Sequence, residues 1–198
     1  MNFDPLNKVL EEFAKGEFIM VLDEHREKEG DFFLLAEHVT PEKINFLLSQ
    51  ARGMICVACD KSIIDKFKLP LMVEENSDKF GTNFCVSVDA KNEITTGVSA
   101  FDRAKTISIL ADPKATILDL VKPGHTFPLL AKDKNRFGHT EAATFLAKKL
   151  NRIPVVVICE ILNSSGEKAS TTELFSLSKE KNCPITNLES IKSVLENE

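Results

Sequence analysis

The sequence predicts an α+β fold: a single domain whose mixed β-sheet is packed between helices in three layers. Apolar runs of strand length alternate irregularly with helical patterns along the chain. Two of these runs flank a short charged segment around residue 25, which predicts an antiparallel hairpin rather than a purely parallel sheet. The 198 residues fit one domain and contain no internal repeat or long linker, so we expect one domain over residues 1–198.

The first part of the chain is expected to alternate helices and strands. Apolar residues recur at helical spacing from Leu6 to Phe13, which predicts a helix over residues 4–15 that ends at Gly16. The expected elements that follow are strands at 18–22 and 32–36, a helix begun by Pro41, a strand at 54–58, a short helix around 63–67 and a loop at 68–82.

In the rest of the chain, alternation predicts a strand at 84–90, and a continuous apolar run predicts a buried strand at 155–162. Helices are expected at 100–111, 140–150, 173–179 and 188–195. The segment between residues 112 and 138 is punctuated by prolines and glycines, and we assign no regular element to it.

Composition narrows the classes of function. The net charge of −5 gives no reason to expect a nucleic-acid partner, so an anionic substrate needs a local basic pocket. Apolar runs stay well below the roughly 18 residues of a membrane helix. The first 18 residues contain acids and no apolar block, unlike a signal peptide. We expect a cytoplasmic protein without a membrane partner.

Five cysteines lie mostly in apolar stretches: Cys56, Cys59, Cys85, Cys159 and Cys183. Buried free thiols are the simplest interpretation. Cys56 and Cys59 form a CxxC, for which zinc binding or redox chemistry is the alternative. A zinc ribbon needs a second pair, which the sequence lacks, and a redox motif normally begins a helix, whereas this one lies in an expected strand.

Residues 23–31 contain five acidic side chains between two apolar runs. In an extended chain, Glu27, Glu29 and Asp31 share one face and repel one another. A hard divalent cation with oxygen ligands, such as magnesium, would relieve that repulsion. The alternative is a solvated hairpin tip, which is what charge runs commonly are.

Two histidines lie beside glycines, His125 in Pro-Gly-His and His139 in Gly-His-Thr. Thr140 can cap the expected helix, whose N-terminus would suit a phosphate, and Arg136 could add a bidentate contact. The alternative is that Thr140 is only a cap.

Glu160 is expected on an apolar strand face with Val156 and Ile158. A carboxylate is costly there unless it is paired, so Glu160 is a candidate general acid or base. The alternatives are a structural glutamate paired with Lys or Arg, or a strand end that already meets water.

These segments together resemble the 3,4-dihydroxy-2-butanone 4-phosphate synthase family from about residue 6 onward. The Arg26–Asp31 stretch is similar to the family's Arg-Glu-x-Glu-Gly-Asp loop. Four more motifs follow in the same order: TTGVSAFDRA at 95–104, PGHTFPL at 123–129, GHTEA at 138–142 and ICEI at 158–161. Five motifs in order are far more specific than one.

The resemblance implies a magnesium-dependent lyase, with manganese as an alternative metal and two ions in each site. It would convert D-ribulose 5-phosphate to L-3,4-dihydroxy-2-butanone 4-phosphate and formate in riboflavin biosynthesis. Metal ligands would be Glu27 and His139. Substrate would contact Arg26, Glu27, Asp31, Arg136, Phe137, Gly138, His139, Thr140 and Glu160. Essential catalytic groups would be His125 and Glu160, with Glu29 and Asp23 as further acid/base candidates.

The resemblance also implies a homodimer with active sites near the subunit interface and an acidic loop that closes over the substrate. The chain departs from the family pattern at His25, where Asp is usual, and at Phe137, where a small residue is usual. Residues 128–138 are also shorter than usual. Two alternatives remain open, another metal-dependent sugar-phosphate isomerase or aldolase and a non-catalytic phosphosugar-binding paralogue.

Overall fold

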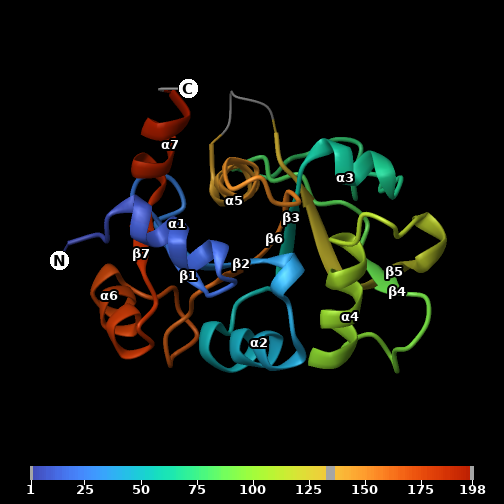
Figure 1. Cartoon of the computed structure of the whole chain (residues 1–198), viewed down its shortest axis with the longest axis horizontal. Coiled ribbons are helices and arrows are strands. Elements are labelled where there is room, and N and C mark those ends of the chain that lie inside the picture. The colour runs from blue at the N-terminus through green and yellow to red at the C-terminus, as the bar shows by residue number, and fades with distance from the viewer. Residues whose placement is uncertain (1, 133–136, 197–198) are drawn as a thin grey trace.

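The computed structural model describes residues 2–132 and 137–196, and one mixed sheet runs through them (Figure 1). Its strands follow the order β4-β5-β3-β6-β2-β1-β7. Their bounds are β1 Ile19–Asp23, β2 Glu29–Leu35, β3 Cys56–Cys59, β4 Val88–Ala90, β5 Leu120–Leu130, β6 Val155–Glu160 and β7 Ile185–Asn187. The pairs β1/β7 and β3/β5 are parallel and the other neighbours are antiparallel, so the expected mixed sheet is confirmed.

Helices alternate with these strands, and several of them begin at polar caps. Their bounds are α1 Leu6–Ala14, α2 Pro41–Phe46, α3 Lys61–Lys66, α4 Ala100–Leu110, α5 His139–Lys149, α6 Thr171–Glu180 and α7 Leu188–Glu196. A π-helical turn, Leu47–Ala51, continues α2, and 3₁₀ turns span Ala36–His38 and Ile117–Asp119. Side chains of Thr40, Ser99 and Ser170 each accept a backbone N–H in the first turn of α2, α4 and α6.

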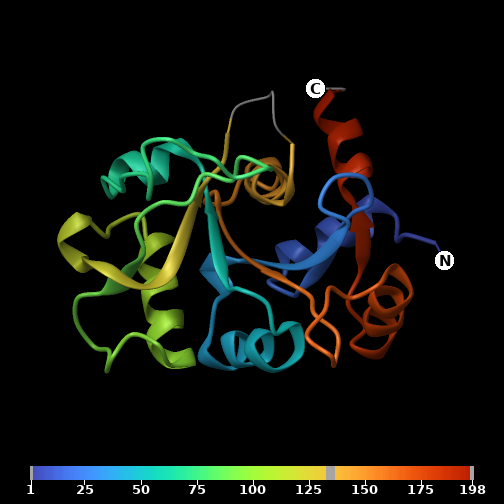
Figure 2. The same cartoon turned by 180° about the vertical axis from the view of Figure 1, so that it is seen from behind.

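Alternate strand residues pack into two apolar clusters. Phe33 and Ile158 belong to the cluster with α1, α5 and α7, whereas Phe32 and Val157 belong to the cluster with α2, α3, α4 and α6. In Figure 1, and from behind in Figure 2, α5 and α7 lie above and α2, α4 and α6 below. This alternation follows from the two-residue period of a strand.

The hairpin around residue 25 is confirmed, since β1 and β2 pair antiparallel with Val21 opposite Asp31. The expected helices are all present, with bounds shifted by a residue or two. The expected strand at 84–90 is wrong in its first part, because the ladder of β4 covers only its last three residues and Phe84 and Cys85 form isolated bridges.

Two strands were not expected, β5 and the short β7. Strand β5 contains Pro123, Gly124 and Pro128, residues that normally argue against a sheet interior. A proline has no N–H to donate to the ladder, but its carbonyl oxygen can still accept a hydrogen bond. The carbonyl oxygen of Pro128, for example, accepts the N–H of Cys85. Strand β7 follows Pro184, whose carbonyl accepts the N–H of Met20 in β1.

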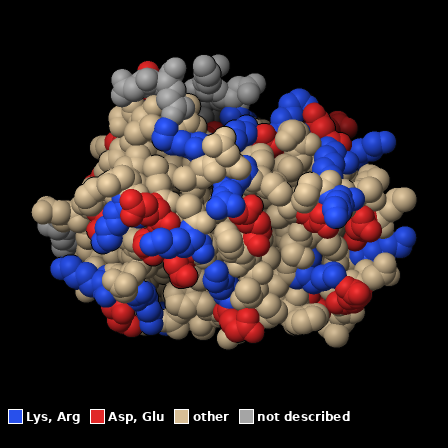
Figure 3. Space-filling view, in the orientation of Figure 1, with Lys and Arg blue, Asp and Glu red and all other residues tan. Residues whose placement is uncertain are grey.

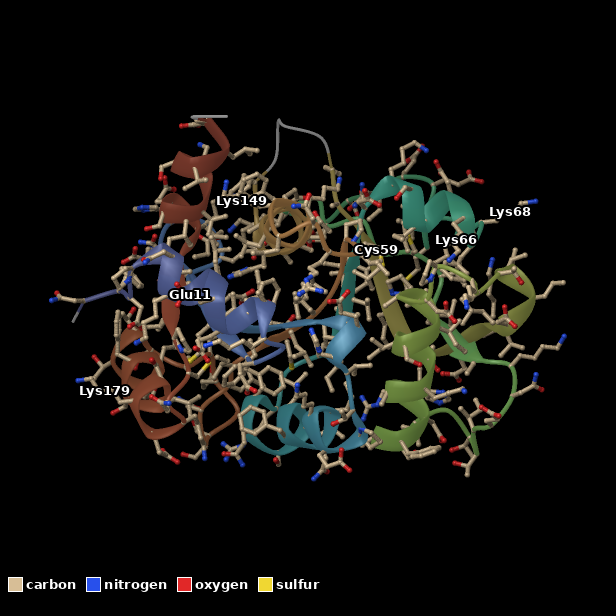
Figure 4. The ribbon with its side chains drawn as sticks, viewed as in Figure 1. Glu11, Cys59, Lys66, Lys68, Lys149 and Lys179 are labelled. Carbon is tan, nitrogen blue, oxygen red and sulfur yellow. The ribbon has the colours of Figure 1, made fainter. Side chains whose placement is uncertain are left out.

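All five cysteines are buried and free, as expected. Cys56 lies in the cluster with α5, and Cys59, labelled at the end of β3 in Figure 4, lies in the cluster with α4. Because they are three positions apart on one strand, their side chains are on opposite faces of the sheet. The CxxC therefore cannot share one metal ion or form a disulfide in this fold.

On the face shown in Figure 3, Lys and Arg side chains are interspersed with Asp and Glu side chains. Among the helices in the described part of the chain, none has the length and apolar character needed to span a membrane.

Candidate active site

A pocket of about 210 Å³ lies where β2 and β6 meet the start of α5. Register places Asp31 of β2 directly opposite Glu160 of β6. The polar side chains that line this pocket include Glu27, Glu29, Asp31, His139, Thr140 and Glu160. The sheet and the N-terminus of α5 thus bring together residues that are more than 100 positions apart in the sequence.

Asp23 shapes the loop that carries Glu27. Its carboxylate accepts the backbone N–H groups of His25, Arg26 and Glu27 at 2.9, 2.9 and 3.0 Å. Although burial opposes it, these three donors lower the pKa of Asp23 below its usual value. The carboxylate lines a neighbouring cleft of about 490 Å³ rather than the pocket. This geometry favours a role in loop shape over the expected proton transfer.

Glu27, Glu29 and His139 form a candidate metal group, with one ligand atom from each lying within 4.8 Å of the others. His139 Nδ1 lies 3.2 Å from Glu27 Oε2, and Nε2 lies 3.1 Å from the carbonyl oxygen of Val21. The carbonyl can only accept, so Nε2 carries the proton in the neutral ring and the Nδ1 lone pair faces the carboxylates. Two carboxylates and one imidazole fit a magnesium or manganese ion.

The charge cluster shifts the proton affinities of its members. Burial lowers the pKa of His139, but the carboxylates of Asp31 and Glu27 outweigh it and raise the value to about 9. Burial also raises the pKa of Glu29. It raises the pKa of Asp31 to about 8 against the opposing effect of His139. Asp31 Oδ1 is buried and has no hydrogen-bond partner among the described residues, so a hydroxyl or a cation would satisfy it.

Glu160 lies at the end of β6, half-buried, and its Oε2 accepts the N–H of Met54 at 2.8 Å. The contact requires Gly53, because a side chain at residue 53 would meet the backbone and carboxylate of Glu160. Within residues 2–132 and 137–196, no Lys or Arg forms an ion pair with Glu160, so the expected alternative of a paired structural glutamate finds no support. Neither Gly53 nor Met54 was predicted to matter.

Arg26 lines the neighbouring cleft and is not among the residues that line the pocket. Its guanidinium donates to the carbonyl oxygens of Phe137 and Phe80 at 3.4 Å each, and it lies over the Phe80 ring. It therefore joins the acidic loop to the loop at 68–82 and to the start of α5.

The start of α5 differs from the expectation. The helix begins at His139, its cap position is Gly138, and the N–H of Gly138 donates to Glu141 Oε2 at 2.9 Å. The prediction that Thr140 caps the helix is wrong, because Thr140 already lies in the first turn, where it is buried and lines the pocket. Arg136 lies outside the described residues.

His125 is not among the residues that line the pocket. It lies on β5, where Phe127 pairs with Cys56 of β3, and Cys56 pairs with Ile158 of β6. His125 itself lies just before this pairing, in the part of β5 where the register with β4 shifts. Its ring Nδ1 lies 2.7 Å from Asp89 Oδ2, and 46% of its side chain is exposed.

Lys168 is a pocket residue that sequence reasoning missed. It follows β6 in a bridged turn, and its ammonium donates to the carbonyl oxygen of Glu27 at 2.7 Å. Three residues of the expected loop at 68–82 also line the pocket, Asp78, Phe80 and Thr82. No local sequence signal marks these residues, because only the fold of distant segments brings them to the acidic loop.

The chain matches known proteins over most of its length. The family model for 3,4-dihydroxy-2-butanone 4-phosphate synthase matches residues 7–194. A relative named 3,4-dihydroxy-2-butanone 4-phosphate synthase from Neisseria meningitidis is 43% identical over 183 residues, 90% of this chain and 50% of the relative. The riboflavin biosynthesis protein RibBA of Bacillus subtilis is 45% identical over 181 residues, 89% of this chain and 45% of the relative.

Solved structures agree with these matches. One similar structure is 3,4-dihydroxy-2-butanone 4-phosphate synthase in complex with two magnesium ions, with a TM-score of 0.94, 34% identity and coverage of 98% of both chains. Another is a two-domain synthase from A. baumannii, with a TM-score of 0.90, 34% identity and coverage of 95% of this chain and 56% of that one. The chain spans about half the length of the curated relatives it matches. It belongs to the 3,4-dihydroxy-2-butanone 4-phosphate synthase family, a family of riboflavin-biosynthesis enzymes.

Proposed function

We propose that this chain converts D-ribulose 5-phosphate to L-3,4-dihydroxy-2-butanone 4-phosphate and formate. The observation that carries the proposal is the group of Glu27, Glu29 and His139 at a pocket that also holds Asp31 and Glu160. The reaction needs several proton transfers on a polyhydroxylated ketone, and this pocket supplies two carboxyl groups, Glu29 and Asp31, whose pKa values are raised by burial.

Glu27 and His139 would hold magnesium, with the Glu29 carboxyl group beside them as an acid/base group. Two ions are proposed for each site, and the similar structure that is a complex with two magnesium ions supports more than one ion. When bound, the metal would polarise the ketone and hydroxyl oxygens of the substrate. His139 can act as a ligand only after it loses the proton that the surrounding carboxylates favour.

The remaining pocket residues would bind the sugar and move protons. Asp31, whose Oδ1 is buried without a described partner, would accept a sugar hydroxyl. Glu160, oriented by the Met54 N–H, would transfer a proton at the carbon skeleton. Glu29 has a pKa raised by burial, which suits a general acid near neutral pH. Arg26 and the segment 136–140 would hold the phosphate end.

The active form is proposed to be a homodimer in which a second copy of the chain brings its His125 to the pocket. Each copy is proposed to have three layers, with the sheet between two layers of helices. His125 does not line the pocket of its own chain, and its ring is half exposed. Three large apolar side chains on the surrounding elements are exposed: Val98 next to Gly97 at 53%, Phe101 at the start of α4 at 60% and Val121 on β5 at 42%. Exposed apolar side chains on these neighbouring elements support burial against another protein surface. The two clusters on the sheet faces support the layer arrangement.

Formate release from ribulose 5-phosphate tests the proposed activity. We expect formate and the four-carbon phosphate in equal amounts with magnesium, and neither product after a chelator removes the metal. Conversion of the pentulose phosphate without formate would instead support an isomerase or aldolase. Binding without any conversion would support the non-catalytic paralogue.

A further inference from the structure

Residues 95–104 form a motif to which the proposed reaction gives no role, and they fold around Asp102. The Asp102 carboxylate accepts the N–H of Thr95 at 3.0 Å, its hydroxyl at 2.7 Å and the N–H of Gly97 at 3.0 Å. The bonds from Thr95 contribute most to lowering the pKa of Asp102 to about 2. An ionised carboxylate thus holds the loop at 95–99 in one conformation.

This loop covers the hydrogen bond between Asp89 and His125. Gly97 has a φ of +96°, and a side chain on it would meet both Asp89 Oδ2 and His125 Nδ1. A residue with a Cβ would therefore push the two groups apart. The loop needs glycine here for its backbone conformation and for this close approach.

A second glycine brings β5 close to the pair from the other side. A Cβ on Gly124 would meet the backbone of Val88 and Asp89, where the register between β4 and β5 shifts. The N–H of Gly124 donates to Ser87 Oγ at 3.1 Å. The two glycines thus let the backbone close on Asp89 and His125 from two directions.

The contacts of Asp89 fix both the backbone and the ring of His125. Oδ1 accepts the N–H of His125 at 2.9 Å, and Oδ2 lies 2.7 Å from Nδ1. The Asp89 side chain is 8% exposed. Because a carboxylate accepts, this network assigns the ring proton to Nδ1 and leaves the lone pair on Nε2.

We propose that Asp89, covered by the Gly97 loop, is a positioning residue that holds His125 in the tautomer protonated at Nδ1. Nε2 is then the atom that accepts or returns a proton, while Asp89 touches no substrate. Among the described residues, the ring faces the carboxylate of Asp89 from β4, and the carboxylate of Asp102 from α4 lies behind the Gly97 loop. The proposal rests on the proposed function in that it takes His125 to be a proton-transfer group.

Nitrogen-15 NMR of histidine-labelled wild-type protein tests the tautomer without any turnover. The chain has four histidines, so a spectrum of His125→Asn identifies the signals of His125 by their loss. We expect a protonated Nδ1 and an unprotonated Nε2 in the neutral ring. A neutral ring protonated at Nε2 would overturn the proposal. Because this measurement is independent of activity, it separates failure of the tautomer from failure of the proposed reaction.

Kinetics of Asp89→Asn test the consequence for catalysis. We expect kcat to fall roughly 100-fold with KM changed little, because the ring is misoriented while the metal and substrate contacts remain. Asp65→Asn is the matched control, since Asp65 lies on α3 and bonds Lys61 at the surface. A folded Asp89→Asn protein with kcat within about twofold of wild type would also overturn the proposal. If the variant does not fold, the wild-type spectrum still decides.

Discussion

At the scale of single residues, the carboxyl groups of Asp23, in the neighbouring cleft, and Asp31, in the pocket, differ in what surrounds them. Asp23 accepts three backbone N–H groups, which lower its pKa, whereas Asp31 is buried beside other acids, which raises its pKa to about 8. The same residue type is therefore kept ionised in one place and favours its proton in the other. Such a spread suits a reaction that needs both acids and bases.

Glu27→Gln removes a charged candidate ligand with almost no change in size. We expect formate release near background at every magnesium concentration, because the amide cannot replace the carboxylate in holding a hard cation. Glu24→Gln is the matched control, since Glu24 bonds Asn187 outside the pocket, and its activity should stay close to wild type. Turnover of Glu27→Gln like that of wild type would remove Glu27 from the metal site.

Glu160→Gln separates catalysis from stability. The amide oxygen can still accept the Met54 N–H, so the melting temperature should stay level or rise while formate release is lost. Ribulose 5-phosphate should still bind, which calorimetry on the same preparation would measure. A loss of melting temperature that accounts for the loss of activity would instead make Glu160 a structural residue.

Metal binding should release protons from His139. Its folded pKa of about 9 lies above the ordinary 6.5, so protonation stabilises the metal-free fold fully below pH 6.5, and this contribution is lost as the pH rises through 9. A ligand imidazole must be neutral, so magnesium at pH 7.5 should displace about one proton from His139 and bind more tightly as the pH approaches 9. Calorimetry in buffers of different ionisation enthalpy measures this release. Binding that is independent of pH between 6.5 and 9 would contradict it.

At the scale of elements, β5 decides where His125 lies. Residues Phe127 to Leu130 of β5 pair with β3. Earlier residues of β5, between Leu120 and Thr126, pair with the short β4, and the register of this pairing shifts between Val88 and Asp89. The close approach at Gly124 is what allows both pairings. The proline-rich sequence of this segment encodes an irregular strand, which a regular alternation pattern does not detect.

Gly124→Ala should cost both stability and activity. The added methyl meets backbone atoms of β4, so we expect a loss of about 1–3 kcal/mol in the free energy of unfolding and a fall in kcat as His125 shifts. Gly166→Ala is the control, because its Cβ meets open space and only the strain of its positive φ, about 1–2 kcal/mol, remains. Denaturant unfolding and formate assays measure the two effects. If the Gly124→Ala protein is destabilised but its kcat is unchanged, the close approach of β5 to β4 contributes to stability and not to catalysis.

At the scale of the whole molecule, the pocket and His125 belong to one chain but do not meet in it. The exposed apolar residues near His125 give the molecule a surface that another copy can bury. Proton transfer by His125 and assembly of the chain are therefore linked in the proposed function.

Mixed dimers test this link. Glu27→Gln and His125→Asn should each be inactive alone, but heterodimers formed after mixing would contain one site with neither change. Random assortment makes half of the dimers mixed, so about a quarter of the wild-type activity should return. Proteins mixed without subunit exchange are the control. No recovery in verified heterodimers would show that His125 acts within its own chain.

The sequence by itself determined the alternation of elements, the hairpin at the acidic loop and the identity of the candidate ligands. Those features are local: apolar periodicity, caps such as Ser99 and the charge run at 23–31 are encoded within a few residues of where they act. The motifs also pointed to the family, because several short matches that occur in the same order are far more specific than one match.

Only the tertiary structure decided which of these residues meet. Strand pairing set Asp31 opposite Glu160, brought Lys168 to the carbonyl of Glu27, and separated His125 from the pocket. It also placed the carboxylate of Asp23 where it accepts three backbone N–H groups of its own loop. Contacts between distant segments depend on register and on close backbone approaches, as at Gly124, and no local pattern specifies them.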